Sequence, residues 1–177
     1  MKVVAFNGSA RTDGNTALLI RRVLQVLEEE GLETELIQLA GKHIHGCNAC
    51  RTCYSTKNKR CVIEEDDVNA YIEKMIEADG IILGSSVYFS MMTPELKALA
   101  DRAFYVARAN DDLFKRKVGA AVVAVPVVPL RPVLHVYQHR VQAVASCLRS
   151  SLELLDPHRR SPGSTNYYAR ILYACIL

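Results

Sequence analysis

Apolar segments and amphipathic segments alternate along the chain up to about Val125. Continuously apolar or β-branched runs such as "GIILGSS" are typical of buried strands, whereas apolar residues spaced three and four apart indicate helices. The first helical segment is followed by Gly31, a typical helix-ending residue, and the last begins at Thr93 with Pro94 and Glu95. The predicted strands are residues 2–6, 33–39, 80–86 and 118–125, and the predicted helices are residues 16–30, 67–78 and 93–107.

Strands that alternate with helices predict right-handed βαβ units around a parallel sheet. The expected fold class is α/β, a doubly wound parallel sheet with helices on both faces, whose ligands bind at the carboxyl ends of the strands. The length of 177 residues is long enough for a real core and fits a single domain over residues 1–177.

Composition narrows the classes of function. Half of the residues are hydrophobic, and the net charge of +3 is too small to indicate a nucleic-acid partner. The apolar stretch at the N-terminus is too short for a signal peptide, and "ILYACIL" is too short to cross a bilayer. We therefore expect a cytoplasmic protein without a membrane partner, whose six cysteines are thiols or ligands rather than disulfides.

The segment "FNGSARTDGNT" lies between the first predicted strand and the first predicted helix. Its glycines let the backbone approach a ligand closely, and its hydroxyls, its arginine and the helix N-terminus suit a phosphate. The segment matches neither the Walker A pattern nor G-x-G-x-x-G, so a mononucleotide fits better than ATP. The alternative is an ordinary βα turn in which Asn15 or Thr16 caps the helix.

Two motifs connect the chain with a known family. "GSARTDGNT" resembles the phosphate loop, and "SSVYFSMMTPELKALADR" the second signature, of the NADPH-dependent FMN reductase family within the flavodoxin-like superfamily. The resemblance covers roughly residues 1–125 and implies a flavodoxin-like fold with bound FMN. It places the FMN phosphate at Ser9, Arg11, Asn15 and Thr16, and the isoalloxazine ring near Ser86, Val87, Tyr88 and Phe89. For the two aromatic residues, core packing is the alternative.

Four cysteines form the pattern C-x2-C-x2-C-x7-C. This run resembles the motif of iron-sulfur flavoproteins, a branch of the same family, which implies a [4Fe-4S] cluster beside FMN. Zinc and a metal-free set of thiols are the alternatives. The nearby His43 and His45 are expected to be surface or capping residues, and the isolated Cys147 and Cys175 to be buried. The candidate metal ligands are Cys47, Cys50, Cys53 and Cys61.

Basic residues flank the cysteine run. They either offset the charge of a thiolate-bound cluster or form a solvated loop. These residues are Arg51, Lys57, Lys59 and Arg60.

The sequence changes character after Val125. Five of the six prolines follow this residue, the last lysine is Lys117, and "PVVPLRPVLHVYQHRVQ" excludes a regular helix or a central strand. Residues 126–177 are therefore either divergent or read in a shifted frame.

The resemblance implies an oxidoreductase of the NAD(P)H:flavin or NAD(P)H:quinone type. NADH or NADPH would bind transiently, and a flavin, a quinone or another small molecule would accept the electrons. No acid–base residue is assigned. The second interpretation is an electron-transfer protein that relays single electrons between cluster and FMN from a ferredoxin-like donor, and the third is a non-catalytic binding module. A homodimer or higher oligomer is expected by analogy.

Overall fold

The computed structural model describes residues 1–88, 91–124 and the backbone of residues 173–174. In this part of the chain five parallel strands form one sheet in the order β2-β1-β3-β4-β5, the order of doubly wound flavodoxin-like folds. In register, Phe6 pairs with Ile37 on one side and Leu83 on the other. The strands are β1 (Lys2–Asn7), β2 (Glu33–Gln38), β3 (Gly80–Ser86), β4 (Val118–Ala124) and β5 (Tyr173–Ala174).

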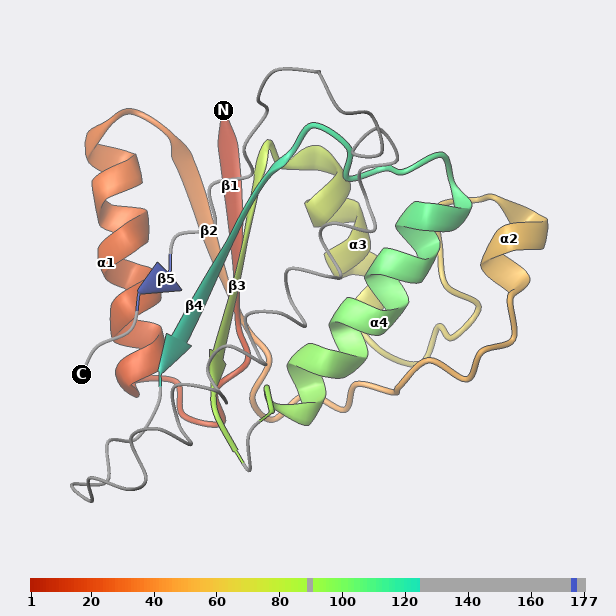
Figure 1. Cartoon of the computed structure of the whole chain (residues 1–177), viewed down its shortest axis with the longest axis horizontal. Helices are drawn as coiled ribbons and strands as arrows, with labels where there is room; N and C mark the ends of the chain where they lie inside the picture. Colours follow the sequence, from red (N-terminus) through yellow and green to blue (C-terminus); the bar gives the residue numbers. More distant parts are fainter. Residues whose placement is uncertain (89–90, 125–172, 175–177) are drawn as a thin grey trace, which may run out of the picture.

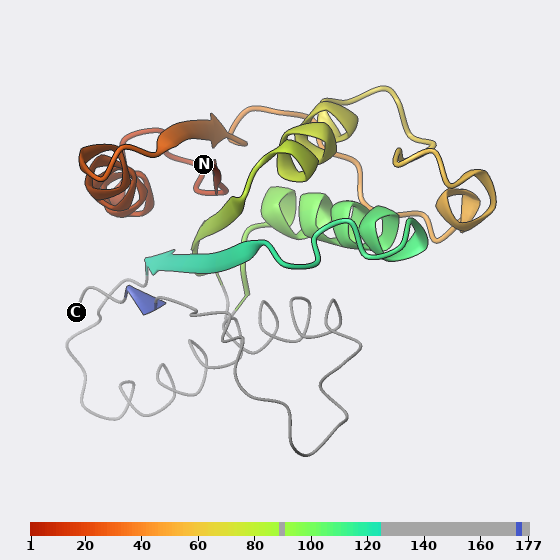
Figure 2. The ribbon, with the colours of Figure 1, turned by 90° about the horizontal axis from the view of Figure 1, so that it is seen from above.

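Helices cover both faces of this sheet (Figures 1 and 2), as the alternation of segments predicts. Helix α1 (Asn15–Glu29) packs on one face, and α3 (Val68–Glu77) and α4 (Pro94–Ala109) pack on the other. A short helix, α2 (Thr52–Thr56), lies beyond them, beside the C-terminal half of α4. None of the helices within the described ranges has the length and apolarity that a bilayer crossing requires.

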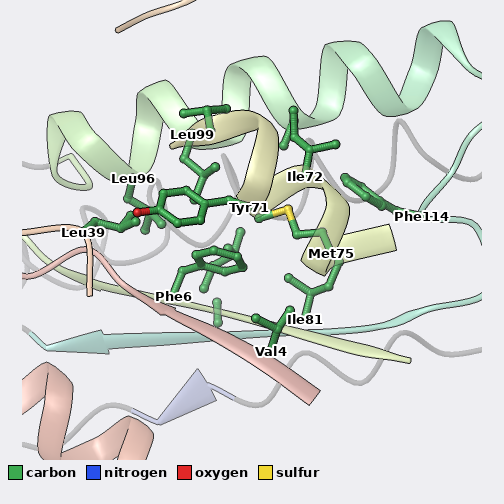
Figure 3. Packing of buried hydrophobic residues seen from close by; sticks show 14 of the residues in the cluster. Val4, Phe6, Leu39, Tyr71, Ile72, Met75, Ile81, Leu96, Leu99 and Phe114 are labelled. Atoms are coloured by element: carbon green, nitrogen blue, oxygen red, sulfur yellow. The ribbon is translucent and has the colours of Figure 1, made fainter. Parts of the chain in front are cut away.

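Residues that alternate along each strand divide the core into two clusters. Val3 and Ala5 face α1, where they pack with Ile20 and Leu24. Val4 and Phe6 face α3 and α4, and the Phe6 ring meets the Tyr71 ring edge-on, with centroids 5.8 Å apart (Figure 3). The larger cluster therefore fixes α3 and α4 on the sheet. Residues 45–66, which contain the four candidate metal ligands and are called the cysteine segment below, are bound to these two helices.

The predicted strands and the three predicted helices are confirmed, with shifts of one or two residues at their ends. Gly31 ends α1 with a φ of +79°, as its position predicts. Helix α4 continues to Ala109, because Val106, Ala107 and Ala109 extend its buried face. Val125, the last residue of a predicted strand, lies outside the described residues. The sequence did not predict α2, since five residues are too few to show a helical period.

Candidate functional site

The loop between β1 and α1 is held in shape by its own polar side chains. The Asn7 side chain accepts a hydrogen bond from Ser9 N (3.1 Å) and donates one to Gln38 Oε1 (2.6 Å). Gln38 Nε2 in turn donates to Ser9 O (2.8 Å), and Ser9 Oγ accepts from Arg11 N (3.2 Å). Asn7 and Ser9 are both buried. The loop is thus preformed at the carboxyl edge of the sheet.

Gly8 lies where three elements meet. Its N–H donates to Gly84 O of β3 (2.8 Å). A Cβ atom at this position would lie 2.7 Å from Thr93 Oγ1, 2.8 Å from Leu96 Cβ and 3.0 Å from Gly84 O. The loop can pass between β3 and the start of α4 only with a glycine here.

The N-terminus of α1 presents free backbone donors to this loop. Gly14 is the N-cap residue, and no side chain among residues 1–88 and 91–124 caps the helix. The alternative in which Asn15 or Thr16 caps the helix is therefore wrong. Within the described part of the chain, the side chain of Thr16 is buried, whereas Arg11 and Asn15 are exposed. Uncapped N–H groups and the positive end of a fifteen-residue helix suit an anion such as a phosphate ester.

The loop after β3 forms the other side of this edge. Ser85 Oγ accepts from Thr93 N (3.0 Å), and Tyr88 and Met91 exchange two backbone hydrogen bonds of 3.0 Å. Ser86 is half-buried, Val87 is buried and Tyr88 is 50% exposed. Phe89 lies outside the described residues.

Two buried hydroxyl groups at this edge, Ser86 Oγ and Thr93 Oγ1, have no hydrogen-bond partner among the described residues. Because buried polar atoms are nearly always paired, a bound ligand at this edge could supply the partners that these two hydroxyls lack among the described residues. Together with the free helix donors and the close approach at Gly8, they fit a phosphorylated flavin at the β1/β3 edge.

The cysteine segment winds along the outside of the helix layer formed by α3 and α4 (Figure 1). Cys47 and Cys50 are exposed, whereas Cys53 and Cys61 are half-buried and pack against the larger core cluster. Four non-glycine residues in this segment have a positive φ, namely Ala49, Arg51, Lys57 and Lys59. The four thiols have the chemistry of a cluster or zinc ligand set. In residues 1–88 and 91–124, however, no three Cys, His, Asp or Glu side chains are close enough to hold a metal ion.

The two cysteines that flank the start of α2 have shifted pKa values of opposite direction. Hydrogen bonds from the Thr52 hydroxyl and backbone N–H lower the pKa of the exposed Cys50 thiol. Burial raises the pKa of the Cys53 thiol, and the nearby Cys50 and Cys61 add to this effect. His43 and His45 are exposed, as predicted, while Cys147 and Cys175 lie outside the described residues.

Three buried polar side chains fasten the cysteine segment to α3 and α4. Asn69 accepts from Cys61 N (2.7 Å) and donates to Cys61 O (2.9 Å). Asn110 accepts from Lys59 N (3.0 Å). The Arg102 guanidinium donates to Cys61 Sγ, to two backbone carbonyl groups and to Asp66.

Sequence reasoning missed these anchors and the residues that brace the first loop. One signal was available for Arg102. It follows Leu99 by three residues and precedes Val106 by four, so it interrupts the apolar face of a predicted helix. A charged residue in that position needs a buried partner. The missed residues are Asn7, Gln38, Asn69, Thr93, Arg102 and Asn110.

Comparison with known proteins agrees with this geometry. The family model described as NADPH-dependent FMN reductase matches residues 1–147. An iron-sulfur flavoprotein of Methanocaldococcus jannaschii is 47% identical over 122 residues, which are 69% of this chain and 61% of that protein. One of Methanosarcina thermophila is 38% identical over 122 residues, again 69% of this chain and 62% of that protein. The chain thus spans about three fifths of the length of these curated relatives.

Solved structures share the fold at low sequence identity. The NAD(P)H:quinone oxidoreductase from Methanothermobacter marburgensis superposes with a TM-score of 0.64 at 14% identity, over 82% of this chain and 73% of that one. RosB, solved with a bound riboflavin-phosphate intermediate, gives 0.58 at 17% identity, over 88% of this chain and 60% of that one. The flavodoxin-like α/β fold is thereby confirmed. With a family model that matches most of its length, the chain belongs to the NADPH-dependent FMN reductase family.

Proposed function

We propose that the protein is an FMN-dependent oxidoreductase. The observation that carries this proposal is the preformed loop between β1 and α1 with its uncapped helix N–H groups. Two buried hydroxyls that have no partner among the described residues lie in the segment after β3, at the same edge of the sheet. Ser9, Arg11, Asn15 and Thr16 would bind the phosphate. Ser86, Val87, Tyr88 and Phe89 would lie along the isoalloxazine ring, with the exposed Tyr88 side chain free to cover it.

When bound, FMN would supply the redox chemistry of such a reaction, with NADH or NADPH as the hydride donor and a flavin, a quinone or another small molecule as the electron acceptor. The chain's own residues would bind and orient the cofactor, and NADH or NADPH would be a transient donor. We assign no acid–base residue to this reaction. Membership of the NADPH-dependent FMN reductase family supports the proposal.

Replacement of Ser9 by alanine tests the phosphate site. The change removes a donor to the phosphate and also the acceptor for Arg11 N. Since a hydrogen bond to a charged group contributes about 1.5–3 kcal/mol, we expect the Kd for FMN to rise by about 10–100-fold. Fluorescence titration of the FMN-free protein measures this Kd.

Thr12→Ala is the matched control, because Thr12 is exposed in the same loop and its side chain has no hydrogen bond within the described residues. Equal FMN affinity in Ser9→Ala and wild type would contradict the phosphate assignment. Wild-type protein that stays colourless with excess FMN would favour the non-catalytic binding module.

A second candidate is an iron-sulfur flavoprotein that relays single electrons. Four thiols within fifteen residues, on a segment fastened to the core by Arg102, favour it. The ligands would be Cys47, Cys50, Cys53 and Cys61, and a [4Fe-4S] cluster would supply one-electron chemistry beside the two-electron chemistry of FMN. The names of the relatives support this candidate.

Anaerobic purification tests the cluster. We expect about four irons and four sulfides per chain together with FMN, as the stoichiometry of a [4Fe-4S] centre requires, and loss of the iron in Cys53→Ser with the FMN retained. Measurement of iron, zinc, sulfide and flavin on one sample decides between the alternatives. Zinc in place of iron, or active protein free of metal, would contradict the cluster.

The surface of the cysteine segment fits an acidic protein partner such as a ferredoxin-like donor. Arg51, Lys57 and Lys59 are exposed and form no ion pair within the described residues, whereas Arg60 pairs with Glu73. Free positive charge around the thiols raises the encounter rate with a negatively charged protein.

A further inference from the structure

Within the described residues, the hydrogen bonds of the Arg102 side chain all go to the cysteine segment. Its side chain has 0% exposure and pairs with Asp66, whose side chain is 1% exposed. Nε donates to Cys61 Sγ (3.3 Å), Nη1 to His45 O (3.2 Å) and Nη2 to Ile63 O (2.8 Å). One guanidinium on α4 therefore holds both ends of the segment that contains the four cysteines.

Two residues form hydrogen bonds with three groups of Cys61, namely its N–H, its carbonyl group and its sulfur. Asn69 of α3 bonds its backbone N–H and its carbonyl group, and Arg102 of α4 bonds its sulfur. Cys53 lies against α4 as well, with its Sγ 4.0 Å from Tyr105 O. Cys47 and Cys50, in contrast, are exposed. The thiols of Cys53 and Cys61 therefore lie against the helices, whereas those of Cys47 and Cys50 are exposed.

We propose that Arg102 is a positioning residue for the metal site. It holds the sulfur of Cys61 in place as the first metal ligand. The exposed Cys47 and Cys50 then move towards this sulfur when a metal centre forms. The proposal rests on the cysteine set being the metal site of the second candidate function above.

The chemistry of the guanidinium suits this role. It keeps its charge when buried and can donate to a thiolate, a carboxylate and carbonyl groups at once, which a lysine cannot. A hydrogen bond to a ligand sulfur also stabilises the negative charge of that sulfur, so it raises the reduction potential of an iron-sulfur centre. Partners of ligands typically contribute 10–100-fold to metal affinity.

Cobalt(II) titration of the reduced, metal-free protein under nitrogen tests the proposal. The sulfur-to-cobalt charge-transfer bands report the number of thiolate ligands. In Arg102→Lys we expect about tenfold or more weaker cobalt affinity and the bands of fewer than four thiolates. After reconstitution with iron and sulfide, we expect a lower reduction potential than in wild type.

Two controls separate positioning from a general loosening of the segment. Arg108→Lys changes an exposed arginine of the same helix and should match wild type. Asn110→Ala frees the segment at Lys59 without touching Cys61, so it should keep the four-thiolate bands and the wild-type potential. Wild-type cobalt affinity in Arg102→Lys, or the same band and potential changes in Asn110→Ala, would overturn the proposal.

A measurement on wild-type protein covers the case in which Arg102→Lys does not fold. With ¹⁵N-labelled arginine, the Arg102 Nε–H resonance should be protected from solvent exchange and should shift when zinc binds; an unchanged resonance would overturn the proposal. FMN titration of the same sample judges the flavin proposal separately, because the phosphate loop contacts the start of α4 at Thr93, about 14 Å along the helix from Arg102. Wild-type protein that takes up no cobalt would end both the metal site and the role of Arg102, and would leave the flavin proposal untouched.

Discussion

Asp66→Ala is expected to lower the free energy of unfolding by about 3–5 kcal/mol, the range for removing one partner of a buried ion pair. The change leaves the Arg102 charge buried without its carboxylate, and it removes the acceptor for the N–H groups of His45 and Val68. Equilibrium denaturation followed by circular dichroism measures the difference. Asp101→Ala is the control, since the Lys97–Asp101 pair on α4, the helix of Arg102, is partly exposed, with side-chain exposures of 40% and 42%, and should contribute less than about 1 kcal/mol.

The stabilisation by Asp66 should be lost at acidic pH and kept at neutral pH. Burial alone would raise the pKa of Asp66, but hydrogen bonds from Arg102 and from two backbone N–H groups outweigh it, so the pKa lies below its ordinary value. The stabilisation is therefore complete above the unfolded pKa of about 3.9 and is lost as the pH falls through the lower folded pKa. The stability gap between wild type and Asp66→Ala should narrow below about pH 4. A gap that stays constant into acid would contradict the role of the ionised carboxylate.

Gly8→Ala is expected to destabilise the protein by about 1–3 kcal/mol or more, the usual cost of overpacking, and to weaken FMN binding at the same time. The added methyl group would lie 2.8 Å from Leu96 Cβ and 3.0 Å from Gly84 O. These neighbours belong to a helix and to a strand backbone, which cannot rotate away as the end of a flexible side chain can. The start of α4 must then separate from the β1/β3 edge. Denaturation and FMN titration of the same variant check both effects.

Gly46→Ala is the matched control for Gly8→Ala. A Cβ atom at Gly46 would meet nothing within 4 Å, and its φ is not in the left-handed region. We expect its stability to stay within about 0.5 kcal/mol of wild type, as for most surface changes. Comparable losses in the two variants would show that the close approach at Gly8 is unimportant.

The sequence pattern was sufficient to predict the fold, because the predicted helices and most of the predicted strands bury a largely apolar face, and single polar residues such as Arg102 do not hide the period. Val3 and Val4 face opposite layers of the core, and the continuous apolar run of residues 3–6 is typical of a strand that is buried on both faces. The phosphate loop could be predicted for a similar reason, since its glycines and hydroxyls directly follow a strand. The roles assigned to Ser9, Arg11, Asn15 and Thr16 stay predictions.

The anchors of the cysteine segment could not be predicted in the same way. Arg102 and Asp66 are 36 residues apart. The sequence around either residue does not indicate that the other is its partner. Asn69 bonds the backbone of Cys61. Because almost every residue has the same backbone groups, the sequence does not show which residue Asn69 binds. The winding backbone around Arg51 and Lys57 also lacks the glycines that normally announce a positive φ.

The anchor helix follows the cysteines in the chain, and this order matters while the protein is being made. Arg102 comes 41 residues after Cys61. At about 5–20 residues per second, a ribosome adds these residues in about 2–8 s. Throughout that interval the cysteine segment lacks its anchor on α4, although Asn69 of α3 has already been added. For the proposed metal site, this order of elements favours metal binding after α4 has been synthesised.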